Sequence, residues 1–462
     1  MQLLRTDVPV IVEGLYKELV EGYHLYFNPE SYGGPLLLDD EAEELLQYCH
    51  GQSSVSEIQR SIRGEKVFRT LETMAKNEIV SISLEFTESL RESARKEPSF
   101  SCWLHLTNSC NLACKYCYIH KSPGSMSSIQ GKELLNRLVK SCLQNNIGKL
   151  GIKYAGGEPL TKYSLLKDLV EYSEKMSCDV TIDNMLLTNG ILLTSEIAEF
   201  LKRHHFHVGL SLDGLEEAHD RSRVDRRGRG SFQDVLKGLK ILKDYHVSFS
   251  TLVTVSASSF RQLPEFTEFA LKNGLRFRYS LERDIDTGHP ALLDLQDELV
   301  DVLNECYDLI EANLPIKDIN RIHKFCDVSL TRPINRTCAA GSSFTAIDHS
   351  GNMGLCGLGL SIPFGALEAG DDIIAKTRNS NNNLRSMKGS NYELCSSCFW
   401  RKSCAGGCPL QTYKTFGRYD MPSPYCQVFK AVIPRLLRIK GLQMLRDSSK
   451  ESKSEVLSVN NI

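Results

Sequence analysis

The chain has 462 residues, of which 24% are charged and 41% hydrophobic, a balance that excludes a mainly disordered protein and predicts two to four domains. Its 55 basic and 57 acidic residues give a net charge of −2, which argues against binding nucleic acid or anionic lipid through overall charge. No stretch approaches the ~18 apolar residues of a membrane span, and no secretory leader opens the sequence, so we expect a cytoplasmic protein.

Residues 1–95 are predicted to form a winged-helix-like domain. Two apolar, aromatic-rich runs within residues 21–40 flank an Asn-Pro and a Gly-Gly turn, which predicts a β-hairpin. Three short helices should follow, at residues 41–49, from the capping box Ser54-x-x-Glu57 onward, and at residues 67–76. A short strand should then follow at residues 79–83. The polar residues 87–99 fit either a linker or a connecting helix.

Residues 96–290 show a regular alternation of strand and helix patterns. Six strands are predicted, at residues 102–107, 150–155, 180–188, 207–212, 247–255 and 275–281. Helical patterns of ten or more residues separate them, so the fold class is α/β with a parallel sheet, either open or curled into a partial (β/α)6 barrel. In such folds the chemistry lies at the carboxyl ends of the strands.

The remaining chain divides into three parts. Residues 291–325 are predicted to be a helical connector, residues 326–445 a cysteine-rich domain, and residues 446–462 a polar, disordered tail. The cysteine-rich part lacks regular periodicity, so we expect metal–ligand bonds to substitute for a hydrophobic core.

The sixteen cysteines are unusual for a protein of a reducing compartment, where disulfides are rare. Cys110, Cys114 and Cys117 lie in one short loop after the first strand of the alternating region. Three thiolates in such a loop can hold three corners of a four-iron four-sulfur cluster and leave one iron open. A zinc site, with His120 as fourth ligand, is the alternative.

This CxxxCxxC loop, with Tyr116 before its last cysteine and a βα series behind it, resembles the radical S-adenosylmethionine (SAM) superfamily. The resemblance implies that the open iron chelates SAM and that an electron from the cluster splits SAM into methionine and a 5′-deoxyadenosyl radical. It implies a radical SAM barrel for residues 96–290 and an oxidoreductase activity.

Further polar residues end the following strands. Gly156-Gly157-Glu158-Pro159 matches the family's GGEP motif, in which glycines let backbone carbonyls approach an ammonium group and the glutamate adds an acceptor. Asn189, Ser211 and Asp213 are suited to ribose hydroxyls or the SAM carboxylate. The resemblance suggests that Arg223, or else Arg221, pairs with Asp213.

The later cysteines resemble the SPASM domain, which holds two auxiliary four-iron four-sulfur clusters. The resemblance assigns Cys338, Cys356 and Cys408 to the first auxiliary cluster, with Cys326 as fourth ligand unless that cluster has an open iron. It assigns a second set of four to the other auxiliary cluster: Cys395, Cys398, Cys404 and Cys426. A zinc ribbon would explain only four of these cysteines. The other five are expected in apolar interiors: Cys49, Cys102, Cys142, Cys178 and Cys306.

Residues 1–95 are similar in their order of elements to PqqD-like domains, which recognise leader peptides of ribosomally made precursors by adding them as a strand to a sheet edge. A small stability or dimerisation domain is the alternative. A winged-helix DNA reader is disfavoured because residues 39–44 are acidic and no basic recognition helix is present.

Together these resemblances imply a radical SAM maturase of a ribosomally synthesised peptide, with three four-iron four-sulfur clusters and a flavodoxin- or ferredoxin-type electron donor. The expected product is a thioether or carbon–carbon crosslink; epimerisation and backbone excision use the same radical start. Glu282 and Asp284 are candidate catalytic acids or bases.

Two other functions would also account for part of the sequence. An anaerobic sulfatase-maturing enzyme shares the core and the SPASM domain, but in that group an aspartate follows the cysteine that is Cys356 here, and this chain has Gly357. A non-catalytic iron–sulfur electron carrier is disfavoured because it would not need the GGEP motif beside the cysteine loop.

Overall fold

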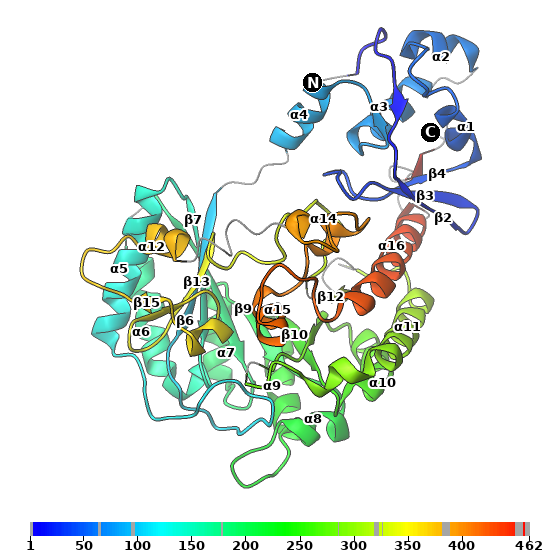
Figure 1. The fold of residues 1–462 in the computed structure, drawn as a ribbon. Coiled ribbons are helices and arrows are strands. Elements are labelled where there is room, and N and C mark those ends of the chain that lie inside the picture. Colours follow the sequence, from blue (N-terminus) through cyan, green and yellow to red (C-terminus); the bar gives the residue numbers. More distant parts are fainter. Residues whose placement is uncertain are drawn as a thin grey trace.

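The computed structural model describes residues 3–62, 66–93, 98–176, 179–284, 286–317, 323–325, 327–380, 389–448 and 456–457. An N-terminal unit of strands and small helices stands beside a central α/β unit, and the C-terminal part of the chain runs over the central unit and back to the N-terminal one (Figure 1).

The N-terminal unit contains an antiparallel sheet of β2 (Tyr16–Val20), β3 (Tyr23–Phe27) and β4 (Leu36–Leu38). The predicted hairpin is β3–β4, and the predicted capping box is present at the start of its helix. The helices are α1 (Asp40–Leu46), α2 (Val55–Ser61), α3 (Val67–Lys76) and the connecting helix α4 (Leu84–Ser93). A separate strand pair joins β1 (Val10–Ile11) to β5 (Val80–Ser81).

Residues 446–462 were predicted to be a disordered tail, but those of them that the structure describes lie in a helix and a strand. Helix α16 (Cys426–Ser448) continues past residue 446 because its apolar side chains, such as Leu442 and Met444, are buried against the N-terminal sheet. Farther on, β16 (Val456–Leu457) pairs in parallel with β4 and extends that sheet to the order β16-β4-β3-β2.

The central unit confirms the predicted α/β alternation. Six parallel strands follow one another in the sheet: β6 (Ser99–His105), β7 (Lys149–Ala155), β8 (Thr181–Thr188), β9 (His207–Ser211), β10 (Ser248–Val255) and β11 (Phe277–Leu281). The helices between them are α5 (Ser128–Gln144), α6 (Tyr163–Glu174), α7 (Ser195–Arg203), α8 (Glu216–Ser222), α9 (Phe232–Asp244) and α10 (Leu263–Lys272).

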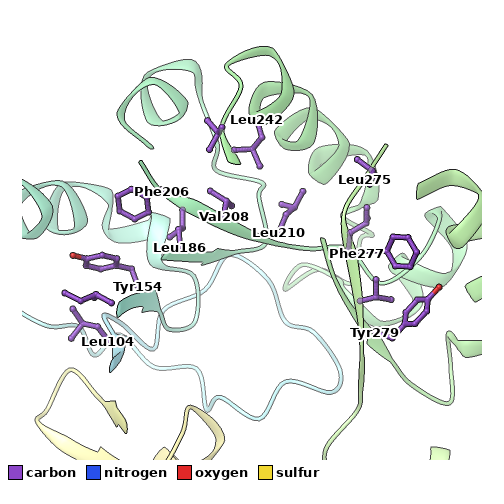
Figure 2. Packing of buried hydrophobic residues seen from close by; sticks show 14 of the residues in the cluster. Leu104, Tyr154, Leu186, Phe206, Val208, Leu210, Leu242, Leu275, Phe277 and Tyr279 are labelled. Atoms are coloured by element: carbon purple, nitrogen blue, oxygen red, sulfur yellow. The ribbon is translucent and has the colours of Figure 1, made fainter. Parts of the chain in front are cut away.

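Alternate strand residues form the main core because successive side chains of a strand point to opposite faces. Leu104, Tyr154, Leu186 and Val208 are almost fully buried and lie with Phe206 among the strands and their covering helices (Figure 2). The residues between them therefore point into the concave side of the sheet.

The C-terminal part adds strands to both edges of this sheet. β12 (His323–Phe325) pairs with β11, and β13 (Phe344–Ile347) pairs in parallel with β6. β14 (Asn352–Gly354) and β15 (Gly365–Ala366) continue from β13 as antiparallel strands. The short helices of this part are α12 (Ile373–Asn379), α14 (Arg401–Cys404) and α15 (Pro409–Phe416).

Two long helices connect the N-terminal unit to the rest. The predicted connector is α11 (Gln296–Ala312), which packs along α16. Arg438 of α16 donates hydrogen bonds to Glu18 at 3.0 Å and to Glu311 at 3.3 Å and so joins β2, α16 and α11. No helix among the described residues is long and apolar enough to cross a bilayer.

Candidate functional site

The candidate site lies at the carboxyl ends of the central strands, as the fold class predicts. The loop between β6 and α5 carries Cys110, Cys114 and Cys117, and all three border a cavity of about 270 Å³. We call this the cysteine-loop cavity. The sequence-predicted residues that also line it are Gly156, Gly157, Glu158, Asn189, Ser211 and Arg223.

The two glycines of the GGEP motif are required by the cysteine loop itself. Gly156 has a φ of +147°, and a Cβ there would lie 2.4 Å from the carbonyl oxygen of Thr107. A Cβ on Gly157 would lie 2.3 Å from the carbonyl oxygen of Ser109. Without side chains, the N–H of Gly157 can donate to Thr107 at 2.7 Å, so the end of β7 holds the loop in place.

Glu158 is buried, and both of its carboxylate oxygens already accept hydrogen bonds. One accepts from the N–H of Leu160 at 3.0 Å and from the hydroxyl of Thr188 at 2.8 Å; the other accepts from the N–H of Asn189 at 2.8 Å. Burial raises its pKa despite these donors. The side chain therefore ties the end of β7 to the end of β8, a positioning role in addition to the expected role of acceptor.

Asn189 and Ser211 sit where β8 and β9 end. The amide of Asn189 donates to the side-chain oxygen of Asn111 in the cysteine loop at 2.8 Å, and its own oxygen accepts from Ile191 N–H at 3.1 Å. Both residues border the cysteine-loop cavity. They place short polar groups opposite the three thiols.

The predicted pairing of Arg223 with Asp213 is confirmed. Two guanidinium nitrogens of Arg223 donate to the carboxylate at 2.7 and 3.2 Å, the hydroxyl of Tyr116 donates to it as well, and Thr254 N–H donates at 2.9 Å. Burial alone would raise the pKa of Asp213, but Arg223 outweighs it and holds that pKa below its ordinary value. Arg221, the suggested substitute, instead pairs with Glu217 on the surface.

His219 belongs to the same buried network, and sequence reasoning missed it. Its Nδ1 accepts from Asp213 N–H at 3.3 Å and its Nε2 lies 3.1 Å from the hydroxyl of Ser231. Burial, with the nearby Arg223 charge, lowers its pKa from 6.5 to about 4.

This shift predicts a loss of stability in mild acid. Between pH 6.5 and 4, His219 is protonated in the unfolded chain but stays neutral in the folded chain. The free energy of unfolding should therefore fall as pH falls through this range, by at most ~3 kcal/mol. Denaturant unfolding at several pH values should show this slope, and His219→Gln should flatten it. An unchanged slope in the variant would remove His219 as its source.

A second, larger cavity of about 680 Å³ lies inside the barrel, next to the first. We call it the central cavity. Cys338, Cys356 and Cys408 border it, although they come from three separate segments of the C-terminal part. The structure thus brings together three of the four cysteines predicted as one set; the fourth, Cys326, lies outside the described residues.

The other predicted set also converges. Cys404 ends α14, Cys426 begins α16, and Cys395 and Cys398 lie in the turns before α14. Burial raises the pKa of Cys395 to about 11 and that of Cys404 to about 12, and the neighbouring thiols of the set raise both further, as their closeness requires.

Glu282 and Asp284 follow β11, as expected, but neither borders the two cavities. The carboxylate of Asp284 accepts from the N–H groups of Asp286 and Thr287 and from the hydroxyl of Thr287. It therefore closes a turn. Burial, with Asp284 nearby, raises the pKa of Glu282.

Comparison with known proteins shows the family to which this chain belongs. The model of the Radical SAM superfamily matches residues 104–270. An uncharacterized protein of Methanocaldococcus jannaschii is 32% identical over 204 residues, which are 44% of this chain and 69% of that protein. The chain belongs to the radical SAM superfamily.

Two further proteins match this radical SAM chain over more of its length. A protein of Clostridium novyi named cysteine-type anaerobic sulfatase-maturating enzyme is 25% identical, over 70% of this chain and 91% of its own. The structure of Streptococcus suis SuiB bound to precursor peptide SuiA covers 91% of this chain and 100% of its own, with a TM-score of 0.52 and 16% identity. The second likeness is one of fold.

The residues fit the cofactors of a radical SAM enzyme, SAM and a four-iron four-sulfur cluster. In the described part of the chain, no three His, Cys, Asp or Glu side chains lie close enough together to bind a single metal ion. The three loop thiols instead border a cavity whose opposite side is lined by backbone and polar groups. Burial raises the pKa of Cys114 to about 11, so cluster binding must release protons. Lys121 donates to the sulfur of Cys117 at 2.9 Å and can balance thiolate charge.

Proposed function

We propose that this radical SAM enzyme modifies a ribosomally synthesised precursor peptide and forms a thioether or carbon–carbon crosslink in it. Cys110, Cys114 and Cys117 would hold the cluster that binds SAM. The two later cysteine sets would hold auxiliary clusters, giving three in all, and a flavodoxin or ferredoxin would supply electrons. The proposed domains are residues 1–95, 96–290, 291–325 and 326–445.

The observation that carries this proposal is the continuity of the two cavities. The cysteine-loop cavity and the central cavity share the lining residues Trp103, Tyr118, Leu187, Leu252 and Arg278. A peptide side chain in the central cavity would therefore face the SAM pocket on one side and Cys338, Cys356 and Cys408 on the other. This arrangement suits a reaction that begins at SAM and ends with an electron passed to an auxiliary cluster.

When bound, SAM and the reduced cluster supply a 5′-deoxyadenosyl radical that removes a hydrogen atom from an unactivated carbon. Trp103, Leu187 and Leu252 would exclude water and competing hydrogens from the contact between the cavities. Asp213 and Arg223 would hold Tyr116 and the end of β10 around the pocket. Loop residues thus orient the substrates, and strand ends fix the loop.

The relatives support a peptide or protein substrate. The Clostridium novyi protein is named for maturation of sulfatases, and SuiB was solved with precursor peptide SuiA. A sulfatase-maturing activity is the second candidate, because that relative matches along most of both chains. Against it, Gly357 occupies the position at which that group has an aspartate, and a Cβ there would lie 3.0 Å from the ring of Trp103 and from the hydroxyl of Tyr118.

One experiment tests the proposed function. The protein, reconstituted anaerobically with iron and sulfide, is reduced in the presence of SAM and a coexpressed precursor peptide, and the products are analysed by mass spectrometry. We expect 5′-deoxyadenosine and a peptide lighter by two hydrogen atoms. Release of 5′-deoxyadenosine with conversion of a sulfatase-derived peptide alone would favour the second candidate, and no release at all would favour an electron carrier.

We propose that the leader peptide adds to the N-terminal sheet at β4. β16 already shows that this edge accepts a parallel strand, because Val456 and Leu457 pair there with Leu37 and Leu38. The chain's own C-terminal segment would then compete with the leader for the same backbone groups.

Ending the chain after Ser448 should therefore strengthen leader binding. If β16 is docked for about 70 to 90% of the time, the affinity measured by fluorescence anisotropy should rise roughly threefold to tenfold. This truncation leaves α16 whole, whereas deleting residues 1–95 would uncover Ile433 and Leu437, which pack against Leu25. An unchanged or weaker affinity would contradict docking at β4.

A further inference from the structure

The described lining of the central cavity contains four cations, Lys153, Arg276, Arg278 and Arg283, of which Lys153 and Arg278 lie inside strands. On β7, Leu150, Ile152 and Tyr154 are fully buried among the helices, so Lys153 lies on the opposite, concave face. On β11, Phe277 and Tyr279 are buried in the same way, and Arg278 between them faces the concave side. Lys153 and Arg278 both border the central cavity.

Among the described residues, neither Lys153 nor Arg278 has an acidic partner. Within the described residues no carboxylate lies within salt-bridge distance of Lys153 or of Arg278, whereas Arg283 pairs with Asp327 at 2.7 Å. Asp327 is also the only acidic side chain that the described lining of the cavity contains. Burial, and then the charge of Arg278, lower the pKa of Lys153. Bringing an anion between these two side chains would relieve the repulsion and restore that pKa.

The surroundings of the two cations are apolar on one side and open on the other. The Nζ of Lys153 lies 4.8 Å from the centre of the Phe344 ring, which also borders the central cavity. Arg278 borders the cysteine-loop cavity as well as the central one, so it stands at the junction where the substrate would react.

We infer that Lys153 and Arg278 form a carboxylate-binding subsite that anchors an acidic substrate group beside the SAM pocket. The inference rests on the proposed function and narrows its substrate class to a peptide with a carboxylate near the modified residue. That carboxylate is either an Asp or Glu side chain or the C-terminus of the peptide. Arg278, with its planar fork, supplies paired donors, and Lys153 supplies the second charge.

Three synthetic peptides of seven residues test this subsite on the anaerobic holoenzyme with SAM. All have N-acetylated Gly-Ser-Gly-X-Gly-Ser-Gly: one with X = Asp and a C-terminal amide, one with X = Asn and a free carboxylate, and one with X = Asn and an amide. We expect one of the two carboxylate peptides to bind about tenfold tighter than the neutral one by calorimetry, and the tighter of them identifies the source.

Variants then locate the effect. Lys153→Met and Arg278→Gln should each remove the tenfold difference, whereas Lys237→Met, on the surface of α9, should keep it. Equal affinity of all three peptides for the wild-type protein would overturn the inference without needing any variant. A tenfold difference in affinity that persists in both variants would also overturn the inference. A loss of bound iron from Lys153→Met would overturn it as well, because that result would assign the lysine to a cluster.

The same samples separate this inference from the proposed function. If the wild-type protein releases 5′-deoxyadenosine on reduction but binds the three peptides equally, only the carboxylate subsite fails. If the peptides are discriminated but no 5′-deoxyadenosine forms, the subsite stands and the proposed radical chemistry fails.

Discussion

Replacing Cys114 by alanine should abolish SAM cleavage. The three loop thiols border one cavity, and a cluster left with two protein ligands would lose its geometry for SAM at the open iron. Reduced, reconstituted Cys114→Ala should give no detectable 5′-deoxyadenosine. Its iron content should fall to about two thirds of the wild-type value if the two auxiliary clusters remain.

Cys142→Ala is the matched control, because this cysteine is fully buried on α5 and is not among the proposed ligands. It should keep both iron content and 5′-deoxyadenosine release. If Cys114→Ala kept the wild-type iron content, the assignment of the loop to a cluster would be wrong. A fall in iron of far more than one third would mean that the auxiliary sets depend on the loop.

The central fold could be predicted because its strands carry a local signal. Apolar residues such as Leu186, Val208 and Phe277 recur at every second position, and the intervening helices have apolar faces. β2 was missed because Lys17 and Glu18 interrupt its apolar pattern. β13 carries no local signal for its partner β6, because parallel pairing between distant segments depends on the whole fold.

The sequence predicts which residues line the site better than it predicts the structural role of each. Gly156 and Gly157 were expected to admit an ammonium group, yet their missing side chains make room for the backbone of Thr107 and Ser109. Such contacts depend on where a loop returns in space, which spacing in the sequence does not specify.

The sequence carries a local signal for two further features of the site. Lys153 and Arg278 alternate with buried residues inside predicted strands, so their inward direction followed from strand periodicity. The acids Glu282 and Asp284 were chosen for their place after a strand, but a following turn can use such side chains, as Thr287 and Asp284 show.

Replacing Asp213 by asparagine should strongly destabilise the protein. The change preserves shape and an acceptor oxygen for Thr254 N–H, but it leaves the guanidinium of Arg223 buried without a countercharge. Breaking one partner of a buried ion pair costs about 3–5 kcal/mol, a large part of the ~5–15 kcal/mol that stabilises a typical domain. The denaturant midpoint should fall accordingly, with the slope of the transition unchanged.

The physical cause can be isolated with a second change. Replacing Arg223 by methionine in the Asp213→Asn background removes the unpaired charge, so the double variant should be more stable than Asp213→Asn alone, because a buried pair can be exchanged for uncharged groups at little cost. Asp234→Asn, which breaks the exposed pair of Asp234 with Lys237, should leave the midpoint unchanged. If the double variant were less stable than Asp213→Asn, the loss would come from the hydrogen bonds of Tyr116 and Arg223 rather than from an isolated charge.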